Sequence, residues 1–242
     1  MIRQWLFGSR AHKPYHLRGG EVYRIETFSD AVMAFSITLL VAALEVPQTY
    51  HELKATLLGG LPFACTVALV FLFWYQQYRF FRLYGINDTT VVLLNMLMLA
   101  VLLFYVYPLK FLFQLLLTMT LGINFFTEAA NQGHEIIGQQ YFPGLVVIYS
   151  LGYAAIWLTF LLMHLHAWRL RHRLQLNAHE QTECRMEIRG ALADVGVGLL
   201  AAGLALAVSP LAGGLCFLAI PLLLWLNGTW YRRQVSRLPH NL

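Results

Sequence analysis

The sequence predicts an all-helical membrane protein with six membrane-spanning helices, and two observations carry this prediction. The first is composition: 58% of the 242 residues are hydrophobic and 12% are charged, whereas an ordinary soluble domain has roughly 45–50% and about 25%. Too little polar surface remains to cover a soluble globule. The many large aromatic residues exclude a disordered or collagen-like chain. The second observation is a set of long apolar stretches.

Six stretches are long enough to cross a bilayer, which takes about 20 mostly apolar residues at about 1.5 Å per residue. They are residues 28–46, 56–75, 89–109, 145–163, 191–208 and 211–231. We therefore divide the chain into an N-terminal arm (1–27), a membrane domain (28–231) and a tail (232–242). The third stretch stays apolar through Leu117, so we expect either a kink at Pro108 or an interfacial continuation. Ser209-Pro210 leaves room only for a tight hairpin.

The positive charges predict the orientation of these helices. An even number of spans puts the N-terminal arm, the second and fourth loops and the tail on one side, and these segments hold 15 of the 17 Lys and Arg residues. Only Lys54 and Lys110 fall on the other side. Because cytoplasmic loops are enriched in Lys and Arg, both termini should be cytoplasmic. Topology and contact with anionic membrane lipid account for the net charge of +5, so no nucleic-acid partner is needed.

The sequence gives little support for a catalytic site or a metal site, so we expect that the protein is not an enzyme and has no cofactor. The chain lacks the nucleophile-elbow, zinc-protease and phosphate-loop motifs. Its three cysteines are widely spaced, which argues against a zinc site or a disulfide framework. His164 and His166 project about 200° apart on a helix, and His172 and His179 have no Cys or acidic partner at ligand spacing.

The first apolar stretch is the unusual one, because polar residues continue into it. Most charged residues mark the membrane edges, and Asp30 is the informative exception. At about 100° per residue, one narrow stripe of the helix is shared by six residues, and Asp30 lies about 140° from one of them, Phe35. The stripe contains Phe28, Ala31, Phe35, Thr38, Leu39 and Ala42. A pore-lining helix would have this pattern; alternatively, its small and hydroxyl residues serve only close helix packing.

The spacing of Arg24, Phe28-Ser29-Asp30 and Thr38 resembles the first-helix signature of the transmembrane protein 175 family, which comprises potassium channels of bacteria and of endosomes and lysosomes. Trp74, Asn95 and Pro108 match the Trp, Asn and Pro of the family's next two helices. One departure is Gln77, which stands where the family pattern leads us to expect a histidine.

The resemblance implies a homotetramer in a bacterial inner membrane, with four first helices surrounding a path for K⁺. Family members narrow the pore with rings of large apolar side chains. The matching residues here are Phe35, Leu39 and Ala42, with a hydroxyl ring at Thr38. Phe35 replaces a usual Ile or Leu, and Ala42 replaces a common Leu.

These positions suggest a mechanism without the Thr-Val-Gly-Tyr-Gly filter of other potassium channels, which the chain lacks. Phe35 and Leu39 would form a dry constriction that gates by dewetting, and Thr38 would replace part of the hydration shell of K⁺, which gives modest selectivity over Na⁺. The signature residues Arg24, Ser29 and Asp30 are expected to be architectural. In that role Asp30 accepts hydrogen bonds from partners such as Trp74 and Asn95.

Two other functions stay open from the residues alone. A secondary transporter would use the first helix as its substrate path, although the inverted repeat typical of transporters is not visible in this sequence. A structural membrane subunit would leave the Phe-Ser-Asp string without a purpose. The polar segment Glu128–Tyr141 is expected to form a folded cap or a vestibule that attracts cations.

Overall fold

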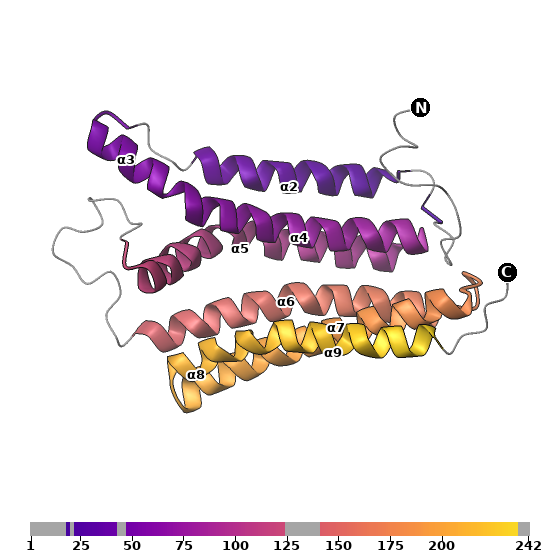
Figure 1. Ribbon diagram of the computed structural model, residues 1–242. Coiled ribbons are helices and arrows are strands. Elements are labelled where there is room, and N and C mark those ends of the chain that lie inside the picture. Colours follow the sequence, from indigo (N-terminus) through magenta and orange to yellow (C-terminus); the bar gives the residue numbers. More distant parts are fainter. Residues whose placement is uncertain (1–17, 20–21, 43–46, 124–140, 237–242) are drawn as a thin grey trace.

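The computed structural model describes residues 18–19, 22–42, 47–123 and 141–236, and the elements in these ranges are helices (Figure 1). The predicted cap at 128–141 lies outside the described residues apart from Tyr141. The helices are α2 (Arg24–Ala42), α3 (Tyr50–Leu58), α4 (Gly60–Tyr84), α5 (Thr89–Leu121), α6 (Phe142–Arg169), α7 (Ala178–Ala207), α8 (Pro210–Leu215), the 3-10 helix η3 (Cys216–Leu218) and α9 (Ala219–Val235).

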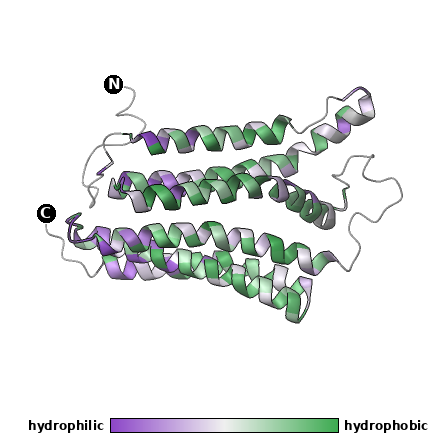
Figure 2. Cartoon of the chain, turned by 180° about the vertical axis from the view of Figure 1, so that it is seen from behind, coloured by the Kyte–Doolittle hydropathy of each residue, from purple (hydrophilic) through white to green (hydrophobic). Residues whose placement is uncertain are grey.

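Six of the helical segments are long and apolar enough to cross a bilayer, which agrees with the predicted number of spans. These segments are Arg24–Ala42, Thr56–Tyr84, Thr89–Thr118, Phe142–Arg169, Ala178–Ala207 and Pro210–Val235. Figure 2 shows that hydrophobic residues dominate their middle parts, while hydrophilic residues gather at the end where α2 begins and α9 ends.

The helices form two halves that lie side by side: α2, α4 and α5 in one, and α6, α7 and α9 in the other (Figure 1). The contact between α5 and α6 joins the halves, and α9 packs on the outer side of α7. The shared core contains Phe73 and Leu102 from the first half and Ile156 and Phe160 from the second, all buried. This packing leaves one long face of α2 uncovered.

Several helices extend beyond their apolar stretches, because their polar ends pair with one another rather than with water. Arg79 of α4 makes ion pairs with Glu183 at 2.8 Å and with Glu187 at 2.9 Å, both on α7. At the start of α7, the Asn177 side chain accepts from the backbone N–H of Glu180, whose carboxylate accepts from the Asn177 N–H. This capping box begins the helix well before its apolar part.

The segment that leads into α2 is anchored to both halves. Arg18 donates to Glu180 at 2.8 Å and to the carbonyl of Leu174 at 3.0 Å, both in the second half. The hydroxyl of Tyr23 donates at 3.1 Å to the carbonyl of Gly85, which ends α4 with a positive φ of 58°. The start of α2 is therefore fixed relative to α4 and α7.

The third span is one helix, α5, that continues through Pro108 to Leu121. Proline leaves the carbonyl one turn earlier without its usual donor, and Figure 1 shows the last part of α5 turning away from α4. The hydroxyl of Tyr149 on α6 donates at 2.6 Å to the carbonyl of Pro108, which ties the bend to the second half. The hairpin after α7 is tight, as predicted, with Ser209 capping α8.

Candidate functional site

The α2 helix has one covered face and one open face. Ser29, Met33, Ser36 and Leu40 recur at intervals of three or four residues and are buried against α4 and α5. The small polar members of this face satisfy their hydroxyls internally: Ser36 donates at 2.7 Å to the carbonyl of Met33. Such short side chains let neighbouring helices approach closely.

The open face carries the stripe that the sequence singled out. Phe35 is 56% exposed, Thr38 and Ala42 are exposed, and Leu39 is half-buried at the edge of the stripe. The hydroxyl of Thr38 donates at 3.0 Å to the carbonyl of Ala34. Since that bond uses its hydrogen, the Thr38 oxygen presents lone pairs outward. The stripe therefore combines large apolar groups with a hydroxyl acceptor.

The signature carboxylate contacts the neighbouring helix. The indole Nε1 of Trp74 on α4 donates at 2.7 Å to Oδ1 of Asp30. Trp74 also stacks on Tyr78, with the ring centroids 5.7 Å apart. The contact between Asp30 and Trp74 therefore joins α2 to α4.

A second chain of hydrogen bonds joins α2, α5 and α4 in the core. Nε2 of Gln77 donates to Oδ1 of Asn95 at 2.5 Å, Nδ2 of Asn95 donates to Ser29 Oγ at 2.8 Å, and Ser29 donates to the carbonyl of Ile25 at 2.7 Å. Asn95 thus reaches Ser29 rather than its neighbour Asp30, which differs from the expected pairing. Gln77 is therefore part of this hydrogen-bond chain, although in the sequence it was only a departure from the family pattern.

The remaining signature residues, Arg24 and Phe28, lie in the first turns of α2. Arg24 is the first residue of α2 and is exposed. Phe28, one turn further on, is 52% exposed on the same side as Phe35. In the described part of the chain, the principal contacts of α2 are with α4 and α5 alone. The open face of α2 therefore has no wall opposite it within these residues.

Asp194 is another carboxylate within the predicted spans, and the sequence pattern did not single it out. Asp194 lies near the middle of α7, is only 4% exposed, and accepts a hydrogen bond at 2.7 Å from the hydroxyl of Tyr153 on α6. Asp30 is therefore not the single informative exception among the charged residues. The signal was present, because Asp194 falls within the predicted fifth stretch.

The histidines do not assemble a metal site among the described residues, where no group of three or more potential ligands occurs. His164 is buried, with Nδ1 at 2.9 Å from the carbonyl of Phe160. Nε2 of His166 lies 2.5 Å from Oδ2 of Asp88, which caps the start of α5. The His164 contact lies within α6, whereas the His166 contact joins α6 to the start of α5.

Residues 24–105 match the protein family described as "Endosomal/lysosomal potassium channel TMEM175". This range contains the whole α2 helix together with Trp74, Gln77 and Asn95. A curated relative named "Potassium channel", from Marivirga tractuosa, is 39% identical over 218 residues, which cover 87% of this chain and 88% of the relative.

Two solved structures are similar to most of the chain. A crystal structure of a variant of the potassium channel MtTMEM175, bound to a nanobody–MBP fusion, superposes with a TM-score of 0.80 at 35% identity and covers 92% of this chain and 98% of that one. A TMEM175 homologue from Chamaesiphon minutus, described as a lysosomal potassium-selective channel homologue, gives 0.51 at 24% identity, covering 84% of this chain and 96% of that one. The second likeness concerns the fold alone.

Proposed function

This chain belongs to the TMEM175 family of potassium channels and is not an enzyme, and from that premise we propose that the open face of α2 lines its K⁺ path. K⁺ passes down its gradient without coupling to another solute. One observation supports the proposal above all: the stripe with Phe35 and Thr38 is uncovered, while the opposite face of α2 is fixed to α4 and α5.

A closed path needs more copies of α2 than one chain supplies. Symmetric assembly provides the missing walls, because each copy then presents the same stripe to a common axis. We propose a homotetramer with four α2 helices around this axis. The exposed aromatic residues of α4 beside Trp74, which include Phe71 and Tyr75, are suited to covering a neighbouring copy.

The narrow part of this path is apolar. Rings formed by Phe35, Leu39 and Ala42 would leave water few hydrogen-bonding partners, so a small inward movement empties the constriction and a small outward movement refills it. Phe35 supplies the largest side chain of the three and serves as the principal gate.

Thr38 supplies the polar contact for the ion. Its oxygen presents lone pairs outward, because its hydrogen is bonded to Ala34. Four such oxygens replace some of the water that K⁺ loses at the constriction. Na⁺ holds its hydration shell more tightly, so its entry into the constriction costs more free energy. The result is a modest preference for K⁺, without a filter of backbone carbonyls.

The hydrogen bonds behind the stripe are architectural. Asp30 with Trp74, and Ser29 with Asn95 and Gln77, hold α2 at one rotation about its own axis. A rotation of one residue, about 100°, would turn Phe35 and Thr38 out of the path. These contacts thus determine which side chains line the ion path, although the contacting residues themselves do not touch the ion.

The orientation follows from the arginine-rich end of the bundle, where α2 begins and α9 ends. We propose that this end faces the cytoplasm, because positive residues are retained on that side. The bacterial origin of the relative from Marivirga tractuosa supports a place in a bacterial inner membrane.

The experiment that tests the proposed function measures flux through liposomes containing only this protein. We expect passive, non-saturating K⁺ flux with single-channel steps, a smaller Na⁺ flux, and four subunits after cross-linking. Phe35→Ala should increase flux by widening the constriction. Phe104→Ala is the matched control, since Phe104 is 85% exposed on α5 and loses the same volume.

Three results would contradict the proposal. Saturating uptake coupled to a second gradient would indicate a transporter. An absence of flux from a well-folded preparation would favour a structural subunit. Equal effects of the Phe35 and Phe104 substitutions on flux would show that α2 does not line the ion path.

A further inference from the structure

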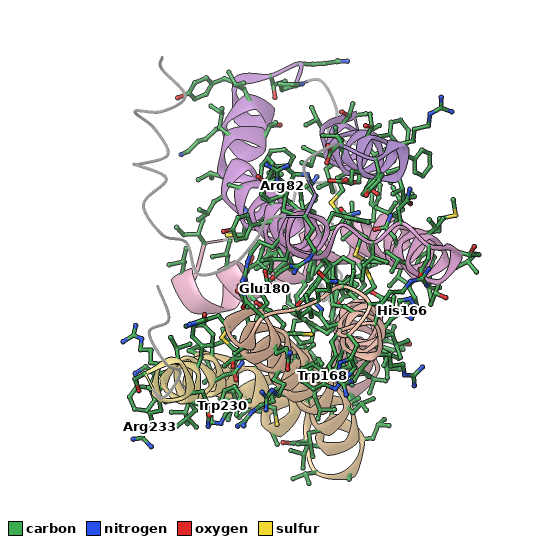
Figure 3. All side chains as sticks on the ribbon, turned by 90° about the vertical axis from the view of Figure 1, so that its right-hand side faces the viewer. Arg82, His166, Trp168, Glu180, Trp230 and Arg233 are labelled. Carbon is green, nitrogen blue, oxygen red and sulfur yellow. The ribbon has the colours of Figure 1, made fainter. Side chains whose placement is uncertain are left out.

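The second half of the molecule carries an arginine and tryptophan surface that lies outside the proposed K⁺ path. It consists of Arg171 after α6, Arg185 and Arg189 on α7, Trp168 on α6 and Trp230 on α9. We call this set the Arg–Trp surface. Figure 3 looks onto this end of the bundle, where Glu180 lies toward the α2–α4–α5 half and Trp168 and Trp230 lie beyond it.

Each guanidinium of the surface is held against an indole ring. The Cζ atoms of Arg171 and Arg185 lie 4.8 Å and 5.4 Å from the ring centre of Trp168, and that of Arg189 lies 4.3 Å from the ring centre of Trp230. Stacking on an aromatic face orders the planar cation and still allows its N–H edge to bind an anion. Nη1 of Arg171 also donates at 3.1 Å to the carbonyl of Trp168. Arg185 and Arg189 are exposed.

The three glutamates of α7 do not neutralise Arg185 and Arg189, because they occupy the opposite side of the helix. Glu180 is paired with Arg18, while Glu183 and Glu187 are paired with Arg79. In the described part of the chain, none of the three stacked arginines makes an ion pair with a carboxylate. The surface therefore keeps an uncompensated positive charge.

A groove of about 180 Å³ starts at Arg189 and runs between α7 and α9. Its remaining lining is mainly apolar and consists of Gly190, Ala193, Asp194, Leu223, Leu224, Leu226 and Asn227. Asp194 is only 4% exposed and accepts a hydrogen bond from the hydroxyl of Tyr153 on α6. Ala193 lies about 6 Å further along the helix axis than Arg189, so the groove leads from the charged surface toward the hydrocarbon.

We propose that the Arg–Trp surface and this groove form a binding site for one anionic phospholipid. The phosphate lies against Arg185 and Arg189, and part of an acyl chain lies in the groove beside Ala193 and Leu223. Arginine binds phosphate through paired N–H donors, tryptophan favours the membrane interface, and anionic lipid is attracted to positive charge at that level. The apolar groove is what distinguishes a lipid site from a site for a free anion.

The test titrates dioleoyl phosphatidylglycerol into the delipidated, detergent-solubilised channel and counts bound lipid by native mass spectrometry. Arg185→Gln and Arg189→Gln should each weaken binding about fivefold, and the pair about thirtyfold, from the usual contribution of one basic residue near anionic lipid. Arg173→Gln is the matched control, because Arg173 is an exposed arginine between α6 and α7 that lies outside the Arg–Trp surface. It should leave the affinity unchanged.

Two further measurements separate the headgroup from the chain. Ala193→Phe fills the groove and should weaken lipid binding, whereas Leu192→Phe, at the neighbouring exposed position, should not. An excess of inorganic phosphate should not displace the lipid. If it does, the site binds a free anion and the proposal is wrong.

The proposal is also overturned if the Arg185/Arg189 double variant binds as tightly as Arg173→Gln, or if the control loses as much affinity as the double variant. Cross-linking that places the α7–α9 face between subunits would overturn it as well. If the double variant does not fold, Arg189→Lys keeps the charge and removes the stacked planar group, and unchanged lipid binding by that variant contradicts the site. Flux is not the readout, so failure here leaves the proposed K⁺ path untouched.

Discussion

The indole nitrogen of Trp74 donates a 2.7 Å hydrogen bond to the carboxylate of Asp30, and this contact joins α4 to the helix that carries the proposed ion path. Asp30 and Phe35 lie on different sides of the same helix, about 140° apart. A contact on the Asp30 side is therefore compatible with Phe35 on the uncovered face. We therefore expect the ordering of the proposed path and the stability of the fold to depend on the same bond.

Replacement of Asp30 by alanine should lower the stability of the channel by about 1.5 kcal/mol, the low end for a hydrogen bond to a charged group, because Asp30 is exposed in the single chain. We expect a lower melting temperature in detergent and a loss of the assembled oligomer on size-exclusion chromatography. Asp30→Asn keeps an acceptor for Trp74 and should lose less. Normal assembly with altered ion flux in Asp30→Ala would instead assign Asp30 a direct role in permeation.

Replacement of Gln77 by leucine should destabilise the fold by about 1–3 kcal/mol, because it leaves Asn95 buried without its donor. The neighbouring Gln76 is only half-buried, so Gln76→Leu serves as the control and should change the melting temperature much less. Similar decreases in melting temperature in both variants would show that the hydrogen bonds through Asn95 and Ser29 do not contribute specifically to stability.

The hydroxyls of Thr38 and Ser36 offer a test of selectivity, since they lie on opposite faces of α2. Thr38→Ala should lower the K⁺ over Na⁺ preference severalfold, because it removes the ring of oxygens from the path. Ser36 is buried and bonded to the carbonyl of Met33, so Ser36→Ala should leave the preference as it is. Reversal potentials under mixed-ion conditions give both values, and an unchanged preference in Thr38→Ala would remove Thr38 from the selectivity mechanism.

Asp88 predicts how stability responds to acid. Burial opposes its ionisation, but the N–H of Val91 and the ring of His166 outweigh burial, so the pKa of Asp88 is lowered below its ordinary value. A carboxyl with a lowered pKa stabilises the fold fully above the unfolded-state value of about 4 and loses this contribution as the pH falls through the folded-state value.

Asp88→Asn should therefore flatten the decline of the melting temperature below about pH 4. Asparagine remains a good helix cap, so α5 should still begin at Thr89. Melting temperatures of the two proteins across the acidic range provide the measurement. Parallel pH profiles would contradict the role of Asp88.

The class of fold and the number of spans could be predicted from the sequence, because a bilayer demands long apolar helices and this chain has six. The ends of the helices could not. The sequence placed the start of the fifth span at Ala191, whereas α7 begins at Ala178. Its polar first turns are stabilised by Arg18 and Arg79 from distant parts of the chain, and such pairings leave no local pattern.

The residues of the candidate site were visible as a stripe and a signature, but their partners were visible only in part. Trp74 was an expected partner of Asp30, and the structure has that bond. Asn95 was expected beside Asp30, yet it reaches Ser29, because the rotation of α5 depends on packing that no single helix encodes. Gln77 was noted only because the family pattern has a histidine there, whereas in the structure its side-chain amide donates to Asn95.

The measurement that tests the central claim most directly is block of K⁺ current by Cd²⁺ in Thr38→Cys and Ser36→Cys channels, with the native protein as baseline. Cd²⁺ binds tightly where several thiolates face one another. If the open face of α2 lines the path, Cd²⁺ blocks the Thr38→Cys channel and leaves the Ser36→Cys channel and the native protein conducting. No block in Thr38→Cys, or equal block in both variants, would contradict a K⁺ path along this face of α2.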